Sequence, residues 1–155
     1  MLRPLLLGDD KRYRMNLPRH LANHNRLHRA SSGVWIKDAD AAFEYSDGEE
    51  AESYIAQTIA QATDRGSLST ELASQIRDWP SEYHLSPLRS NLLRALNLDD
   101  RGPILEIGAG GGAITRYLGE LNIDVDAVEG SYDRACIARL RCADLENVEV
   151  HAVNV

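Results

Sequence analysis

Residues 103–130 read PILEIGAGGGAITRYLGELNIDVDAVEG, and this stretch decides what kind of fold the chain can adopt. It begins with a short apolar run at 103–107, and a loop with four glycines follows at 108–112. The next apolar residues recur at helical spacing, namely Ile114, Tyr117, Leu118 and Leu121. A second apolar run at 124–129 ends in an acid, Glu129. The stretch therefore predicts a strand, a glycine loop, a helix and a second strand.

The same alternation continues to the end of the chain. The apolar pattern of residues 132–140 predicts a second helix, and residues 147–155 are typical of a third strand. Strands that alternate with helices in this way lie parallel in one sheet, with the helices as crossovers. We therefore expect an α/β fold whose Rossmann-like parallel sheet begins with this β-α-β-α-β half, at residues 99–155. A mostly helical region at residues 33–98 precedes it. Within that region, residues 34–36 and 42–45 are expected to be extended, Asp47 can cap the helix that follows it, and Trp79-Pro80 is expected to end a helix over residues 70–77.

The glycine loop and the acid after the second strand together predict a nucleoside site. Glycines let a ligand lie against the backbone, and Glu129 can accept hydrogen bonds from both hydroxyls of a ribose. Glu129 follows Gly108 by 21 residues, close to the ~20-residue interval expected for that role. Two ligand classes fit the loop. The spacing Gly108-x-Gly110-x-x-Ala113 satisfies the dinucleotide fingerprint, which makes an NAD(P)-dependent oxidoreductase one interpretation.

Glu106 favours a second class of ligand. The pattern Glu106-x-Gly108-x-Gly110-x-Gly112 resembles motif I of the class I S-adenosylmethionine-dependent methyltransferases, in which an acid commonly stands two residues before the first glycine. Residues 128–131 resemble the second motif of that family, and residues 147–154 resemble its third strand. The resemblance covers residues 103–155, about one third of the chain. It implies a cofactor site made of Glu106, Gly108, Ala109, Gly110, Gly112, Glu129, Gly130 and Asn154.

The resemblance also implies what these residues do. The glycines would admit the S-adenosylmethionine, Glu106 would orient the loop or meet the methionine ammonium, and Glu129 would hold the ribose. Asn154 stands where the family often has an aspartate that accepts a hydrogen bond from the adenine amino group, and its carbonyl can still accept one. The implied activity is methyl transfer to a small molecule or a sugar, with no catalytic residue identified and no metal.

Residues 79–89 carry a second, looser resemblance. They are similar to a segment of bacterial methyltransferase domains that accompany sugar-transfer enzymes, and this implies cofactor contacts by Tyr83, His84 or Arg89. His84 becomes a candidate general base because histidine titrates near neutrality. The other interpretation is that the aromatic residues of this segment, and His84 with them, only pack against the rest of the protein.

A complete domain of this family resembles a seven-stranded sheet with its first strand in the middle. The sequence supplies three of those strands, so we expect an incomplete chain that binds the cofactor weakly and methylates nothing alone. Its first strand would be an open edge, and a homodimer could cover that edge. A non-catalytic module that keeps only the nucleoside pocket is a third interpretation.

Charge and composition narrow the partners further. The formal net charge is −7, and residues 1–32 hold seven basic and two acidic side chains, so they form a basic segment that we expect to be irregular. The remaining residues are strongly acidic and would repel phosphate backbones, which disfavours nucleic acid as the substrate. No apolar run approaches the ~20 residues of a membrane span. Two cysteines make no disulfide framework, and a cytoplasmic location is expected.

Overall fold

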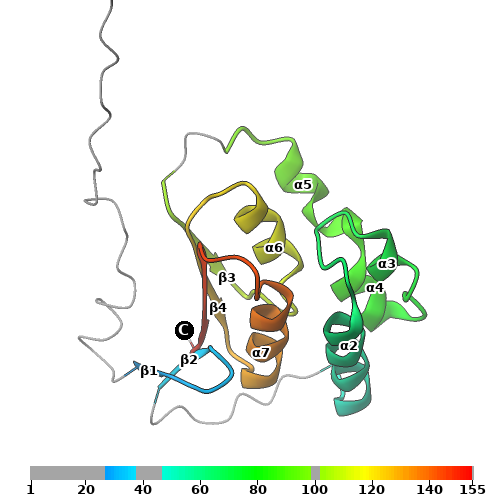
Figure 1. Ribbon diagram of the computed structural model, residues 1–155, viewed down its shortest axis with the longest axis horizontal. Helices are drawn as coiled ribbons and strands as arrows, with labels where there is room; N and C mark the ends of the chain where they lie inside the picture. The colour runs from blue at the N-terminus through cyan, green and yellow to red at the C-terminus, as the bar shows by residue number, and fades with distance from the viewer. Residues whose placement is uncertain (1–26, 38–46, 99–101, 155) are drawn as a thin grey trace, which may run out of the picture.

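The protein contains one five-stranded sheet, built around the predicted strands. The computed structural model describes residues 27–37, 47–98 and 102–154, and Figure 1 shows their arrangement. The strands follow the order β1-β2-β5-β4-β3 across the sheet. Their bounds are β1 Leu27–Arg29, β2 Trp35–Lys37, β3 Ile104–Ile107, β4 Val125–Glu129 and β5 Val148–Ala152. The three strands expected from the sequence are therefore neighbours at one end of the sheet.

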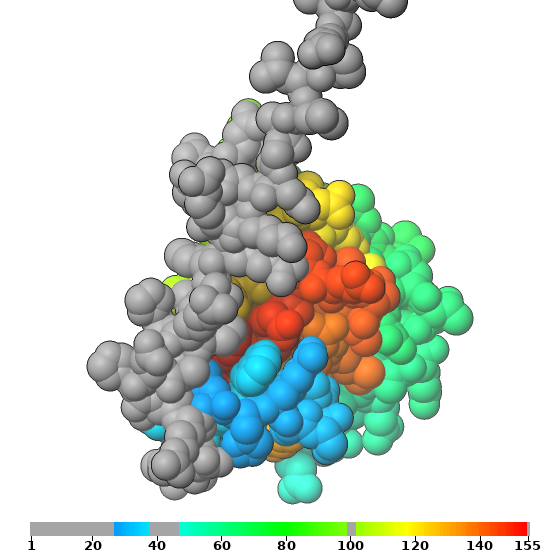
Figure 2. Space-filling view, turned by 60° about the vertical axis from the view of Figure 1, so that its left-hand side comes forward, coloured from blue at the N-terminus to red at the C-terminus, as the bar shows by residue number. Residues whose placement is uncertain are grey.

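The strand pairing makes the sheet mixed but mostly parallel. β3 pairs with β4, β4 with β5 and β5 with β2, all parallel, whereas β1 and β2 form an antiparallel pair. Figure 2 shows residues 27–37 in blue beside the red β5 at the surface. The predicted α/β class with parallel strands is confirmed. The sequence did not indicate that β2 would extend the sheet beyond β5.

The described helices lie on one side of the sheet in Figure 1. α6 and α7 contact the strands, and the helices of residues 49–94 pack outside them, α2 against α7 and the 3₁₀-helix η2 against α6. The mostly helical character predicted for residues 33–98 is thus present, apart from β2. Helix bounds are α2 Glu49–Gln61, α3 Thr70–Ala73, α4 Trp79–Leu85, η2 Pro87–Ser90, α5 Asn91–Arg94, α6 Ala113–Glu120 and α7 Tyr132–Arg141.

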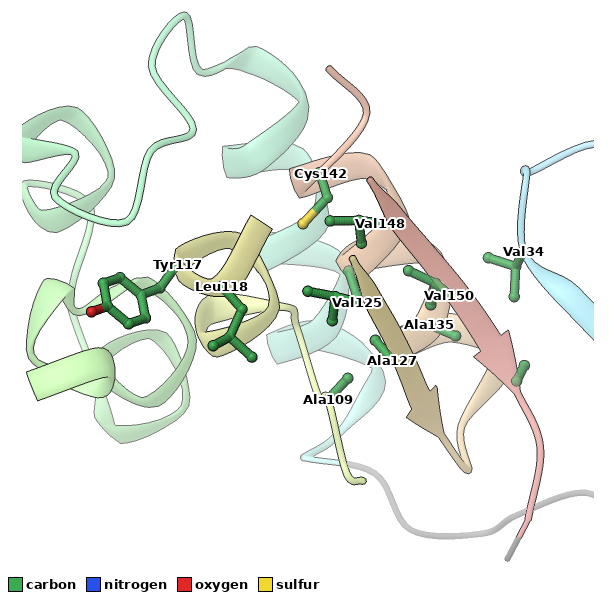
Figure 3. Packing of buried hydrophobic residues seen from close by; sticks show 12 residues of the cluster. Val34, Ala109, Tyr117, Leu118, Val125, Ala127, Ala135, Cys142, Val148 and Val150 are labelled. Atoms are coloured by element: carbon green, nitrogen blue, oxygen red, sulfur yellow. The ribbon is translucent and has the colours of Figure 1, made fainter. Parts of the chain in front are cut away.

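Two apolar clusters hold these layers together. The larger one fills the space between the sheet and helices α6 and α7, and Figure 3 shows its members from both strands and helices. Val125 and Ala127 of β4 and Val150 of β5 are at most 2% exposed. The second cluster joins the N-terminal helices to α7 through Ile55, Ile59, Leu72, Leu85 and Ile137. Burial of apolar area therefore fixes residues 49–85 against the α/β unit.

Several local expectations need correction. Residues 27–29 are a strand rather than irregular chain, because they hydrogen-bond to β2. Trp79 and Pro80 begin α4 instead of only ending the preceding helix, since Asp78 caps α4 and proline is tolerated in a first helical turn. The rest of the basic segment, residues 1–26, and the extended stretch expected at 42–45 lie outside the described residues.

The edge of the sheet at β3 matches the expectation of an open first strand. β3 pairs only with β4 among the described residues, and its outward side chains Leu105 and Ile107 are 41% and 68% exposed. Pairing of this edge with a second copy stays a prediction. Within the described residues, none of the helices has the length and apolar character needed to cross a membrane.

Candidate cofactor-binding site

A cleft of about 340 Å³ lies at the carboxyl ends of β3, β4 and β5. Ligand sites typically have volumes of roughly 300–1,000 Å³. The cleft brings together six of the ten site residues predicted from the sequence, and four positions that were not predicted also line it. Its lining residues are Tyr83, Ile107, Gly108, Gly110, Val128, Glu129, Gly130, Arg134, Val153 and Asn154.

The strand register explains why residues far apart in the sequence meet here. Ile107 at the end of β3 pairs with Val128, and Glu129 at the end of β4 pairs with Ala152 at the end of β5. Parallel neighbours end at the same edge of a sheet, so the loops that follow them converge. Ligands of open α/β sheets bind at this edge.

Glu129 is both a wall of the cleft and a support of the glycine loop. Glu129 is 6% exposed, and its two carboxylate oxygens accept hydrogen bonds from the backbone amides of Gly110 (2.8 Å) and Ser131 (2.9 Å). A carboxylate has about four acceptor sites, so two remain for a ligand. Glu129 therefore orders the loop and can still accept hydrogen bonds from ribose hydroxyls.

The amides of the glycine loop are all used within the protein. Gly108 and Ala109 donate to the Val128 carbonyl oxygen at 2.8 and 3.0 Å, and Gly112 donates to the carbonyl oxygen of Ala109. The Gly110 amide donates to the Glu129 carboxylate, and the Gly111 amide donates to the ring of His84. Dinucleotide sites hold the diphosphate with loop and helix amides that are free to donate. This loop offers such a group no unsatisfied amide from residues 108–112.

Glu106 lies behind the loop rather than in the lining of the cleft. Its carboxylate accepts a hydrogen bond from the hydroxyl of Thr115 on α6 (2.6 Å). Burial raises the pKa of Glu106 to about 7, and the negative charge of Glu129 adds to that increase, against the opposing effect of the Thr115 hydrogen bond. The Glu129 carboxylate therefore contributes negative potential at this end of the sheet, and Glu106 adds to it only as the pH rises through about 7.

We predict that Glu106→Gln stabilises the protein at pH 8 by about 2–3 kcal/mol and has little effect at pH 4. The folded state keeps the Glu106 proton up to pH 7, whereas the unfolded chain releases it near pH 4.5. The free energy of unfolding of the wild type therefore decreases as the pH rises from 4.5 to 7. Gln has no proton to lose, and its side-chain oxygen can still accept from Thr115. Urea unfolding at both pH values measures this, and equal stability of the two proteins at pH 8 would contradict it.

Two loop residues lie away from the cleft. Ala109 is 7% exposed and belongs to the main apolar cluster. Gly112 precedes α6 with a φ of +76°, and a Cβ there would meet Cα of Ala138 on α7 at 2.8 Å. Gly112 thus permits the close contact between α6 and α7. Direct cofactor contacts by Ala109 and Gly112 remain predictions that the geometry of the cleft does not support.

Helix α4 supplies one wall through Tyr83. Arg89 does not line the cleft, because its guanidinium lies over the Tyr83 ring at 3.8 Å from the ring centroid. Trp79, one turn earlier on α4, is 63% exposed and lies 5.5 Å from the Tyr83 ring. Arg89 therefore supports Tyr83, and any effect it has on a ligand would pass through that ring.

His84 has no position from which to act as a general base. It is 2% exposed, and both ring nitrogens have partners within the protein. The Gly111 amide donates to Nδ1 at 3.2 Å, so the ring hydrogen is on Nε2, which donates to the Asp47 carboxylate at 3.0 Å. The packed alternative for His84 is the one that the structure supports.

Arg134 is the charged residue of the cleft that sequence reasoning missed. It stands in the first turn of α7, five residues after Glu129, where neither fingerprint specifies a residue. It forms ion pairs with Asp47 (2.6 Å), which precedes α2, and with Glu52 (2.9 Å) in the first turn of α2. Asp47 looked like a cap for α2, but its carboxylate is used here, and the α2 cap position is Gly48 without a side-chain hydrogen bond.

Comparison with family models, with curated proteins and with solved structures found no match for this chain. Among the residues that the structure describes, no cluster of three or more His, Cys, Asp or Glu side chains could hold a metal ion. Assignment of a ligand therefore depends on the chemistry of the cleft itself.

Proposed function

We propose that the cleft binds S-adenosylmethionine and that the chain provides the cofactor-binding part of a methyltransferase. The observation that carries the proposal is the convergence of Gly108, Glu129 and Asn154 on one cleft, each from the end of a different parallel strand. Under this proposal, β3, β4 and β5 with their crossovers α6 and α7 are the first half of a Rossmann-like sheet.

The charges around the cleft support this cofactor over a dinucleotide. S-Adenosylmethionine carries a sulfonium and an ammonium, whereas NAD(P) carries a diphosphate. The cleft is lined by the Glu129 carboxylate, Glu106 behind it becomes charged as the pH rises through about 7, and the amides of residues 108–112 are already occupied within the protein. The positive charge of Arg134 is balanced by two carboxylates. A cationic ligand gains from this potential, and a dianion loses.

Each wall of the cleft has a task in the proposed complex. Glu129 accepts hydrogen bonds from the ribose hydroxyls through its two remaining acceptor sites, and Asn154 meets the adenine. The bare backbone at Gly108 leaves room for the cofactor, since no atom lies within 4 Å of where a Cβ would be. The bound cofactor supplies an activated methyl group, so the protein has to align the donor with an acceptor and exclude water. The acidic net charge favours a small molecule or a sugar as the acceptor.

Calorimetric titration of the 155-residue chain with S-adenosylmethionine and, separately, with NADH tests the proposal. We expect saturable one-to-one binding of S-adenosylmethionine and no heat from NADH at the same concentrations. S-Adenosylhomocysteine should bind more weakly than S-adenosylmethionine, because it lacks the sulfonium charge. Binding of NADH without binding of S-adenosylmethionine would contradict the proposal and favour the oxidoreductase.

A further inference from the structure

His84 contacts three separate elements around the cleft. Its ring lies between the glycine loop, through the Gly111 amide, and the segment before α2, through Asp47. Its backbone carbonyl accepts a hydrogen bond from Arg141 of α7. Tyr83, the adjacent residue, lines the cleft. A single position of α4 thus connects the cleft wall to the loop that the proposed cofactor would cover.

The His84 ring approaches the loop so closely that position 111 has room only for glycine. Neither ligand fingerprint requires a glycine at position 111, and the residue has no positive φ that would demand one. A Cβ at Gly111 would lie 2.6 Å from Nδ1 of His84, closer than such atoms can approach, and 3.3 Å from Cγ, which is also a tight contact. The glycine at position 111 is therefore explained by the histidine ring and not by a ligand.

We propose that His84 is a positioning residue for the cofactor cleft, and that its Nδ1 atom holds the glycine loop in the ligand-ready shape by accepting the Gly111 amide. This inference rests on the proposed function for its ligand, but the state of the loop can be measured without one. A neutral ring with its hydrogen on Nε2 is required. A proton on Nδ1 would face the Gly111 N–H, and the hydrogen bond would be lost.

The charged groups around the ring define the pH at which His84 takes up a second proton and loses the hydrogen bond from Gly111. Asp47 faces the ring from before α2, Arg134 and Arg141 face it from α7, and Glu129 supports the neighbouring Gly110 amide. Burial lowers the pKa of His84, the two arginines lower it further, and Asp47 opposes them. The ring is therefore neutral at pH 7, and the Gly111 contact weakens only as the pH falls through a value below 6.5.

Replacing His84 by Asn or by Gln distinguishes the hydrogen bond at Nδ1 from the hydrogen bond at Nε2. The side-chain oxygen of His84→Asn can occupy the place of Nδ1 and accept from Gly111, but this side chain does not reach Asp47. The side-chain nitrogen of His84→Gln can occupy the place of Nε2 and donate to Asp47, but it leaves the Gly111 amide without an acceptor. Both variants lose one buried hydrogen bond, so a merely structural role predicts the same effect for both.

The readouts are affinity for S-adenosylmethionine and hydrogen exchange of the Gly111 amide. We expect His84→Asn to keep the Gly111 amide protected and to bind at least tenfold more tightly than His84→Gln, whose Gly111 amide exchanges fast. In the wild type, the Gly111 amide resonance should titrate with the His84 ring, and in His84→Asn it should not. Equal exchange and equal affinity in the two variants would overturn the proposal.

A substitution on the loop side, Gly111→Ala, covers the case in which the His84 variants do not fold. Gly111→Ala should displace the ring and weaken binding at least tenfold, and adding His84→Ala should cause little further loss because the Gly111–His84 contact is already broken. Additive effects would contradict the proposal. If the wild type binds no S-adenosylmethionine, the proposed function fails, and the exchange and titration of the Gly111 amide still decide the role of His84.

Discussion

Gly112→Ala is expected to destabilise the protein by about 3–4 kcal/mol. The φ of +76° at Gly112 is unfavourable for any residue with a Cβ, and the new methyl group would also collide with Cα and Cβ of Ala138 at 2.8 and 3.0 Å. The Cα and Cβ atoms of Ala138 cannot rotate away from the new methyl group, because their positions are fixed by the backbone of α7. Relief would require α6 and α7 to separate, and this would open the main apolar cluster.

Gly108→Ala is the matched control for this prediction. Gly108 has nearly the same φ, +79°, but no atom lies within 4 Å of the added Cβ. Only the backbone penalty of about 1–2 kcal/mol should remain. Thermal or urea unfolding of the two variants compares them directly. Equal losses would mean that the close contact between α6 and α7 is not what position 112 requires.

Glu129→Ala is expected to weaken S-adenosylmethionine binding by at least 100-fold. The substitution removes the acceptor for the ribose hydroxyls, and it leaves the amides of Gly110 and Ser131 without their partner. Loss of one buried acceptor typically costs about 1–3 kcal/mol, so the loop geometry is expected to change as well. Titration calorimetry of wild type and variant under the same conditions measures the loss.

Glu149→Ala controls for the removal of a negative charge from the sheet. Glu149 lies on β5, where its carboxylate accepts a hydrogen bond from the Trp35 indole at 3.0 Å, and it does not line the cleft. The affinity of the Glu149→Ala variant for S-adenosylmethionine should stay within about twofold of wild type, because surface charges are largely screened. Similar losses in both variants would show that Glu129 acts only through net charge.

The central part of the fold follows from local patterns in the sequence. The apolar runs at 103–107 and 124–129 became β3 and β4 with small changes at their ends, and the helical spacing after the glycines became α6. The place of Glu129 at the cleft follows from the same reasoning, because the end of a parallel strand is fixed once the strand is known. Periodicity and loop composition carry this information within a few residues.

The features that were missed depend on contacts between distant segments. β1 is three residues long, too short to give a period. The stretch expected to be extended at 34–36 corresponds to β2, but its pairing with β5, more than 100 residues later in the chain, was not indicated by the sequence. Asp47 has the sequence context of a helix cap, but its carboxylate pairs with His84 and Arg134 instead. Tertiary ion pairs overrode a local preference here, and no local pattern distinguishes the two outcomes.

The most direct test of the cofactor site is a map of amide chemical shifts during titration of the labelled protein with S-adenosylmethionine. We predict saturable shifts at Gly108, Gly130 and Asn154, which line the cleft from three different strands. Amides of the separate surface hollow around Ser67 and Ser69 should not move. Shifts confined to that hollow, or none at the ends of β3, β4 and β5, would contradict the proposed site.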